Sequence, residues 1–195
     1  NAAQECQLAV VEHLGHRFVG REHELFDNLM ADGVRMHVSA DDRAGLLIEA
    51  TRLIAHALPA REAVWWACAC SRLSAASGTH LAAEAEVRGA AEEWVRKPTD
   101  GHRRAAMKQA ETTGFGSAEA WAAIAAFWSG DSMAPPEAPK VPPQPHFTGL
   151  AVAGSVALAA ARGPAVRRDG RLARFLTSAK DIATGGAGRL EAEPD

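Results

Sequence analysis

The clearest hydrophobic pattern in the chain is the run from Ala63 to Cys70, which contains no polar side chain. A helix over this run would be apolar on every side for about two turns, which is typical of a helix packed among several others. Pro59 suits the start of such a helix because its missing N–H would have no helical partner there. Glu62 suits the first turn, where the helix dipole favours an anion. We therefore predict a central, buried helix over residues 60–73.

Apolar residues recur at helical spacing along most of the remaining chain. Ser39 and Ser117 suit helix N-caps, and so does either Thr99 or Asp100. Pro98 marks the end of one helix. These signals predict an all-α fold, a single-domain bundle of about seven to nine helices. Besides the central helix, we predict helices over residues 2–14, 21–31, 39–57, 81–97, 100–113, 118–129, 148–161 and 166–183, and a short extended piece over 34–38.

A second pattern interrupts the helices between Pro135 and Pro145, a stretch that holds six of the ten prolines. Such a stretch must be extended and largely polyproline II, and we predict a proline-rich strap over residues 134–146. Because Trp128 and Phe147 flank it, we favour a strap laid across the protein's own tryptophans. The alternative is a surface docking site, since aromatic grooves recognise the spacing of Pro136, Pro139 and Pro142.

These elements suggest three parts. Residues 1–58 form an N-terminal helical segment, and residues 59–183 form a helical core domain that includes the strap. Residues 184–195, which are rich in glycines and acids, are expected to be a flexible tail.

Composition narrows the class of protein. Hydrophobic residues make up 47% of the chain, and the net charge is −3. This charge argues against a nucleic-acid partner, because nucleic-acid binders are usually basic. The apolar run over residues 150–161 is shorter than the roughly 20 residues that span a bilayer, so we predict no membrane span. Cys68 and Cys70 would point to nearly opposite sides of one helix, so we interpret both as small buried residues of a protein from the reducing cytoplasm.

Polar clusters suggest little chemistry. His13, His16 and His23 lie near one another in sequence, but Gly15 weakens the helix that would hold a zinc site, and we expect surface histidines. The group from His102 to Arg104 is interpreted as a solvated face paired with Glu92 or Glu93, and the alternative is an anion site at the free N–H groups of the helix start. A basic stripe at helical spacing is likewise interpreted as a solvated side, with an acidic partner or a membrane surface as the alternative. Its members are Arg167, Arg168, Arg171 and Arg174.

No pattern predicts a reaction. The turn from Gly114 to Gly116 lacks the lysine of a phosphate-binding loop, and no nucleophile elbow occurs. A thiol in an apolar helix should have a raised pKa, which argues against a cysteine nucleophile. We therefore expect no catalytic residue, no cofactor and no metal.

Several motifs between residues 58 and 183 carry a family resemblance. They include Pro59-Ala-Arg-Glu-Ala-Val-Trp-Trp-Ala67, Glu93-Trp-Val95, Arg103-Arg-Ala-Ala-Met107, Phe127-Trp-Ser-Gly130 and Pro142-Pro-Gln-Pro-His146. In these the chain resembles an uncharacterised family of all-helical proteobacterial proteins. The resemblance implies an association with type VI secretion genes, and hence an accessory or adaptor role. It implies no catalytic residue, because none is established for the family.

We therefore expect a non-enzymatic protein-interaction module, such as an adaptor, chaperone or accessory protein of a bacterial secretion or effector system, with another protein as its partner. Alternatives are an enzyme or small-molecule binder with a pocket near the tryptophans, and an immunity-type protein that blocks a toxin. The expected interaction surface comprises Trp121, Trp128, Pro136, Pro139, Pro142, Arg167, Arg171 and Arg174.

Overall fold

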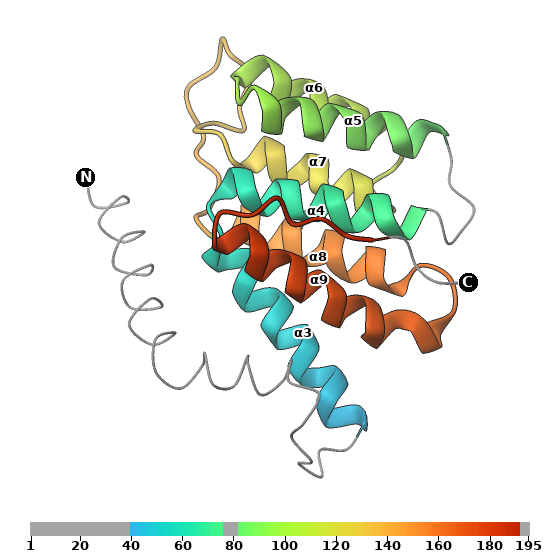
Figure 1. The fold of residues 1–195 in the computed structure, drawn as a ribbon. Helices are drawn as coiled ribbons and strands as arrows, with labels where there is room; N and C mark the ends of the chain where they lie inside the picture. The colour runs from blue at the N-terminus through green and yellow to red at the C-terminus, as the bar shows by residue number, and fades with distance from the viewer. Residues whose placement is uncertain (1–39, 76–81, 192–195) are drawn as a thin grey trace. The chain divides into compact units, whose positions relative to one another are not determined.

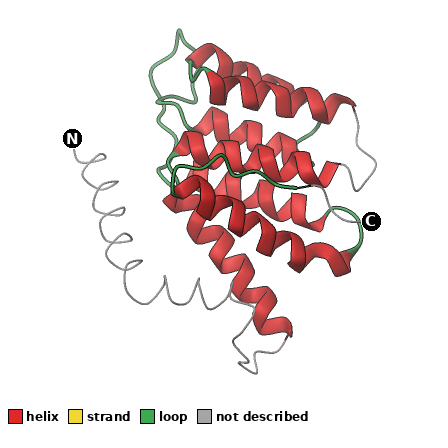
Figure 2. Cartoon of the chain, in the orientation of Figure 1, coloured by secondary structure: helices red, strands yellow, loops and turns green. Residues whose placement is uncertain are grey.

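The computed structural model describes residues 40–75 and 82–191 of the chain (Figure 1). Within these residues every long regular element is a helix, and there is no strand (Figure 2). The fold class predicted from the sequence, all-α, is thus confirmed. The α-helices are α3 (Ala40–Ala57), α4 (Ala60–Ala75), α5 (Ala82–Arg96), α6 (Asp100–Thr112), α7 (Ala118–Trp128), α8 (Phe147–Ala161) and α9 (Arg168–Ala183), and a short 3-10 turn, η2 (Ala165–Arg167), precedes α9.

Each of these helices begins and ends within about two residues of its predicted bounds, because the local signals that set them are present. Thr99 caps α6 by accepting a hydrogen bond from the backbone N–H of His102, and Ser117 caps α7 by accepting one from that of Ala120. Gly114 adopts a positive φ of 73° between these two helices. The predicted elements over 2–14, 21–31 and 34–38 lie outside the described residues.

Two helices form the centre of the packing. α7 packs against α4, α5, α6 and α8, and α4 packs against α5, α7, α8 and α9 (Figure 1). The side chain of Trp66 in α4 is 0% exposed, and its indole N–H donates a hydrogen bond of 2.8 Å to the carbonyl of Phe175 in α9. α7 is largely alanine, and every residue from Ala122 to Phe127 is buried. Small side chains therefore let several helices approach the same two neighbours.

One face of α4 remains only half-buried, at Trp65 and Ala69. The prediction of a helix buried on all sides is correct for the rest of the run. The segment that follows α9 runs back beside this half-buried face (Figure 1).

That segment, residues 184–191, is here called the return segment. It is the first part of the residues 184–195 for which the sequence predicts a flexible tail. Hydrogen bonds join the return segment to α4 and α9, and Gly188 within it is buried. Gly185 and Gly188 adopt positive φ values of 91° and 62°, which lets the chain reverse after α9. The contacts group residues 44–195 into one unit, so most of α3 belongs with the core.

Candidate functional site

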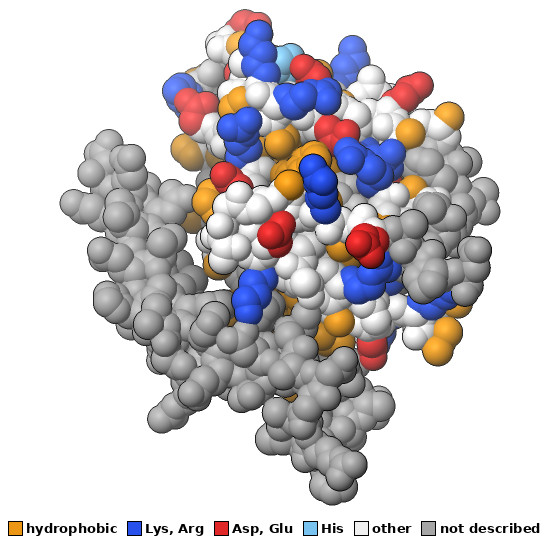
Figure 3. Space-filling view, viewed as in Figure 1, with side chains coloured by type: hydrophobic (Ala, Val, Ile, Leu, Met, Phe, Trp, Pro, Cys, Tyr) orange, Lys and Arg blue, Asp and Glu red, His pale blue; other side chains and the backbone are white. Residues whose placement is uncertain are grey.

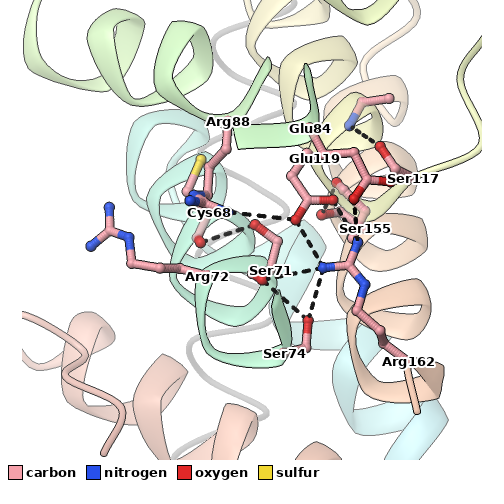
Figure 4. A network of polar contacts seen from close by, with 12 residues as sticks. Cys68, Ser71, Arg72, Ser74, Glu84, Arg88, Ser117, Glu119, Ser155 and Arg162 are labelled. Carbon is pink, nitrogen blue, oxygen red and sulfur yellow. Dashed lines mark hydrogen bonds and ion pairs between the residues drawn. The ribbon is translucent and has the colours of Figure 1, made fainter. Parts of the chain in front are cut away.

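The most unusual polar group in the core is Glu119, which lies in the first turn of α7 and is 0% exposed. A buried carboxylate is costly unless a charge and hydrogen bonds satisfy it. Arg162, directly after α8, supplies both (Figure 4). Its two terminal nitrogens donate to the two carboxylate oxygens of Glu119 at 2.9 and 2.7 Å. This fork is the geometry that a guanidinium and a carboxylate prefer.

Three residues of α5 extend this pair into a network. Arg88 Nη1 lies 3.6 Å from Glu119 Oε1, and Arg88 Nε lies 3.5 Å from Glu92 Oε1. Glu84 Oε2 lies 3.8 Å from Arg162. We call Glu84, Arg88, Glu92, Glu119 and Arg162 the buried ion-pair network, and Figure 4 shows most of its members between α4, α5, α7 and the end of α8.

The local environment shifts the pKa values of two groups at this network, Arg162 and Cys68. The hydrogen bonds from Arg162 to Glu119 raise the pKa of the guanidinium, although burial acts in the opposite direction. Burial raises the pKa of the nearby Cys68 thiol far above its usual range, and Glu92 and Glu119 add to the shift. The thiol therefore stays protonated at neutral pH, as predicted from its place in an apolar helix.

The network is better suited to holding helices together than to chemistry. A general acid or base must reach a substrate, and both oxygens of Glu119 are engaged by Arg162 inside the core. Ser155 in α8 donates to the carbonyl of Ala118 at 2.7 Å, which joins α8 to the start of α7 beside the pair. These contacts join α5, α7 and the end of α8 at one point.

A second polar cluster lies at the base of residues 130–146, which connect α7 to α8 and are here called the proline loop. Arg103 of α6 is only 3% exposed. It donates to the carbonyl of Phe127 at 3.1 Å and to that of Ser132 at 2.7 Å. The predicted solvated face at His102–Arg104 is therefore wrong at its central residue. A side chain on Gly130 would collide with Arg103, so the close approach requires glycine there.

Hydrogen bonds also close the loop on itself. The backbone N–H of Met133 donates to the carbonyl of Val141 at 2.7 Å, and that of Val141 donates to the hydroxyl of Ser132 at 3.1 Å. Arg104 donates to the carbonyl of Ala134 at 2.7 Å, and Lys140 forms an ion pair with Asp131. The two arms of the loop are thus fixed to each other and to α6.

The predicted proline sites all lie on this loop and are exposed. Pro136 sits in a turn in which the N–H of Ala138 bonds the carbonyl of Pro135 at 3.1 Å, so it does not continue the extended run. Pro139 and Pro142 belong to residues 139–144, which form neither helix nor turn. The exposure favours the alternative of a surface docking segment over a strap across the protein's own tryptophans.

The two predicted interface tryptophans are half-buried and turn toward the protein. The indole N–H of Trp121 donates to the carbonyl of Phe115 at 3.0 Å. A side chain on Gly154 of α8 would lie 3.3 Å from the Trp121 ring, so the ring packs closely on α8. The Trp128 ring lies 4.9 Å from that of Phe147 at the start of α8. Both indoles therefore pack against α8, Trp121 near the start of α7 and Trp128 at its end.

The predicted basic stripe does not form one solvated face. Arg167 is exposed, but Arg171 is 1% exposed and donates to the carbonyl of Arg162 at the end of α8. Arg174 donates to the carbonyl of Glu191 in the return segment. Arg167 lies in η2 and Arg168 at the start of α9, and both are exposed, whereas Arg171 packs against the end of α8 and Arg174 contacts the return segment.

The candidate zinc histidines His13, His16 and His23 lie outside the described residues. Within those residues, no group of three or more histidine, cysteine or acidic side chains is placed to hold a metal ion. None of the described helices is long and apolar enough to cross a membrane.

Comparison with known protein families gives a match over most of the chain. Residues 38–183 match the sequence profile of DUF6931, a family of unknown function. The match begins before α3 and therefore includes it, although the sequence motifs placed the core domain from residue 59. No curated protein and no solved structure matches the chain.

Proposed function

We propose that the chain, which belongs to the DUF6931 family, is a non-enzymatic protein-interaction module that presents its proline loop to a partner protein. The observation that carries the proposal is the combination of exposed prolines with a fixed loop base. Pro136, Pro139 and Pro142 are all exposed, and Arg103 is almost completely buried beneath the loop.

A fixed loop loses little conformational entropy when it binds. The ring of proline restricts φ, and the hydrogen bonds between Met133, Ser132 and Val141 hold the two arms of the loop together. Pro139 and Pro142 are three residues apart, which is one turn of a polyproline II helix, so they can present one edge to a partner. Aromatic-lined grooves bind such edges.

The core supports an interaction role better than a ligand-binding role. Trp66 is completely buried, and Phe175 is also 0% exposed beside it. The nearby charges pair with one another in the buried ion-pair network. The indole of Trp66 therefore serves as packing between helices.

The test is direct binding to purified domains that recognise proline-rich segments, followed by capture from an organism that encodes the chain. We expect the full chain to bind at least one such partner. A Pro139→Ala/Pro142→Ala variant should lose most of that affinity. The matched control is Pro135→Ala/Pro145→Ala, which changes two exposed prolines outside residues 139–144 and should bind normally. Equal binding by both double variants would contradict the proposal.

The finer proposal is that the partner belongs to a type VI secretion or effector system, with the chain acting as a cytoplasmic adaptor or accessory protein. It is supported only by the family resemblance in the motifs around Trp65 and Trp94. The genes beside family members in many genomes provide the measurement. Secretion genes beside family members in many genomes would support this role. If most genomes lack such neighbouring genes, the role would be contradicted.

A further inference from the structure

We propose that the outward face of α8 is a docking surface for a second copy of this chain, and that the two copies pack there as an antiparallel pair of helices. The residues that form this face, here called the α8 stripe, are Phe147, Leu150, Gly154, Leu158 and Ala161. The inference does not rest on the proposed function, because the proline loop is a separate element.

The α8 stripe meets solvent without a charged side chain. Leu150 is 50% exposed and Leu158 is 40% exposed, although both are large apolar residues. No residue of α8 is charged, whereas the exposed face of a surface helix usually carries charges. The rest of α8 packs on α4, α7 and α9. A continuous apolar stripe of this kind is typical of an interface, because covering it removes apolar surface from water.

The order of residues along the stripe fits a second copy. Successive members are 3, 4, 4 and 3 positions apart, so the spacing is the same when it is read from either end. A two-fold axis requires such a self-complementary patch. With the axis at Gly154, Leu150 of one copy lies opposite Leu158 of the other. Phe147 then lies opposite the small Ala161, so a large side chain meets a small one at each end.

An indole lies beside the centre of the stripe. Trp121 of α7 is half-buried, and a side chain on Gly154 would lie 3.3 Å from its ring. Its indole N–H already donates to the carbonyl of Phe115, whose side chain is 39% exposed. The exposed part of the Trp121 ring can therefore be covered without leaving a donor unpaired. Aromatic side chains near the centre of a patch often contribute most of the binding energy.

The size and charge of this surface indicate a weak, reversible dimer. The 15 residues of α8 form a helix about 22 Å long. With the flanking rings, the stripe offers on the order of 400 Å² per copy, about half of the roughly 800 Å² that each partner buries in a stable complex. A charged partner would find no opposite charge on the stripe, whereas an equally uncharged second copy buries no unpaired ion. We therefore expect a dissociation constant in the micromolar range.

The experiment measures the association of the full chain by sedimentation equilibrium, and we expect a monomer–dimer equilibrium. Leu150→Lys and Leu158→Glu should each weaken the dimer at least about tenfold, because each places a charge opposite an apolar side chain. The matched control is Val141→Lys. Val141 is also 50% exposed but lies in the proline loop, so this variant should associate as the unmodified chain does.

Mixing the two charged variants tests the antiparallel arrangement. In a mixed dimer, the new ammonium at position 150 lies opposite the new carboxylate at position 158 of the other copy. The mixture should therefore associate more tightly than either variant alone. The double variant Leu150→Lys/Leu158→Glu should likewise regain association. Its two charges cannot pair within one chain, because they lie about 12 Å apart along the helix.

A cross-linking measurement identifies what covers the stripe in the producing cells. A photoreactive amino acid in place of Ala157, an exposed residue at the edge of the stripe, should cross-link two copies of the chain. A cross-link within one chain, or to a different protein, would overturn the inference. This measurement needs neither charged variant, so it remains decisive if one of them destabilises the fold.

Three sedimentation results would also overturn the inference. The first is a full chain that stays monomeric throughout the micromolar range. The second is a dimer that tolerates both Leu150→Lys and Leu158→Glu. The third is a mixture of these variants that associates no more tightly than its components. Melting temperatures within a few degrees of that of the unmodified chain confirm that the compared proteins are folded.

Discussion

At the scale of single residues, Glu119 shows how one buried charge can govern several helices. Glu119 lies in the first turn of α7. Its carboxylate pairs with Arg162, which directly follows α8, and with Arg88 of α5. Arg88 Nη1 is buried and makes no hydrogen bond within the described part of the chain. Its positive charge is therefore compensated by the ion pair with Glu119. Removing one charge from such a set leaves the others uncompensated.

We therefore expect Glu119→Ala to lower the free energy of unfolding by about 3–5 kcal/mol, because Arg162 would lose its two-point partner and the buried Nη1 of Arg88 would lose the carboxylate that faces it. Chemical denaturation of both proteins measures the difference. Glu93→Ala is the control, since Glu93 pairs with Arg96 on the exposed surface, and it should have no measurable effect. A similar small effect of both variants would show that the network contributes little.

Trp66 provides a second residue-scale prediction. Its side chain is 0% exposed and is bonded to Phe175, whereas the neighbouring Trp65 is half-buried beside the return segment. Trp66→Ala should destabilise the protein by about 3–5 kcal/mol through the cavity it leaves. Trp65→Ala should cost clearly less. Melting temperatures lowered equally by the two variants would contradict this placement of α4.

His56 predicts a pH dependence. Burial lowers the pKa of its ring, and the charge of His146 lowers it further. The unfolded chain therefore takes up a proton first as the pH falls, so this contribution to stability is present above about pH 6.5 and is lost as the pH falls through the folded pKa. The ring is partly exposed, so solvent keeps the effect below about 1 kcal/mol. His56→Gln should flatten the fall in melting temperature between about pH 7 and pH 5, and an unchanged slope would contradict this assignment.

At the scale of elements, Arg103 joins the end of α7 to the proline loop. Its guanidinium lies 5.1 Å from the centre of the Phe127 ring and bonds two carbonyls. Arg103→Met keeps the length of the side chain but removes the donors. We expect faster hydrogen exchange at Met133 and Val141 in this variant, because the loop base is loosened. Arg96→Met, on the exposed side of α5, is the control. Unchanged exchange in the loop would show that other contacts hold it.

Helix bounds could be predicted from the sequence because the signals are local. Ser117 and Thr99 cap their helices from the positions that the pattern assigned, and Pro98 separates α5 from α6. The burial of Arg103 and Arg171 could not be predicted in this way. Each arginine pairs with carbonyls at the end of another helix, and only the packed structure brings those carbonyls close.

The buried role of Glu119 was hidden for a similar reason. A glutamate in the first turn of a helix is usually a solvated partner of the helix dipole. The signal that could have revealed it is the apolar character of the rest of α7, whose other residues leave no solvated side. The contact between Trp65 and the return segment was not predicted either. The glycines and acids after α9 suggested a flexible tail, and nothing in the sequence pattern placed that segment beside α4.

At the scale of the whole molecule, the face shown in Figure 3 carries no patch of a single charge that would set a docking direction. Figure 3 shows basic and acidic side chains interspersed over the face it presents, consistent with the net charge of −3. Long-range steering by a field of one sign is therefore weak on this face. If the proposed partner binds at the proline loop, we therefore expect shape rather than long-range charge to guide it.

The position of Arg103 also has a mechanical consequence. A partner that pulls on the proline loop would transmit its force through this side chain to the last turn of α7 and to α6 together, since Arg103 joins all three. Because α6 and α7 would resist this force together, we expect the loop to detach only when the last turn of α7 unfolds.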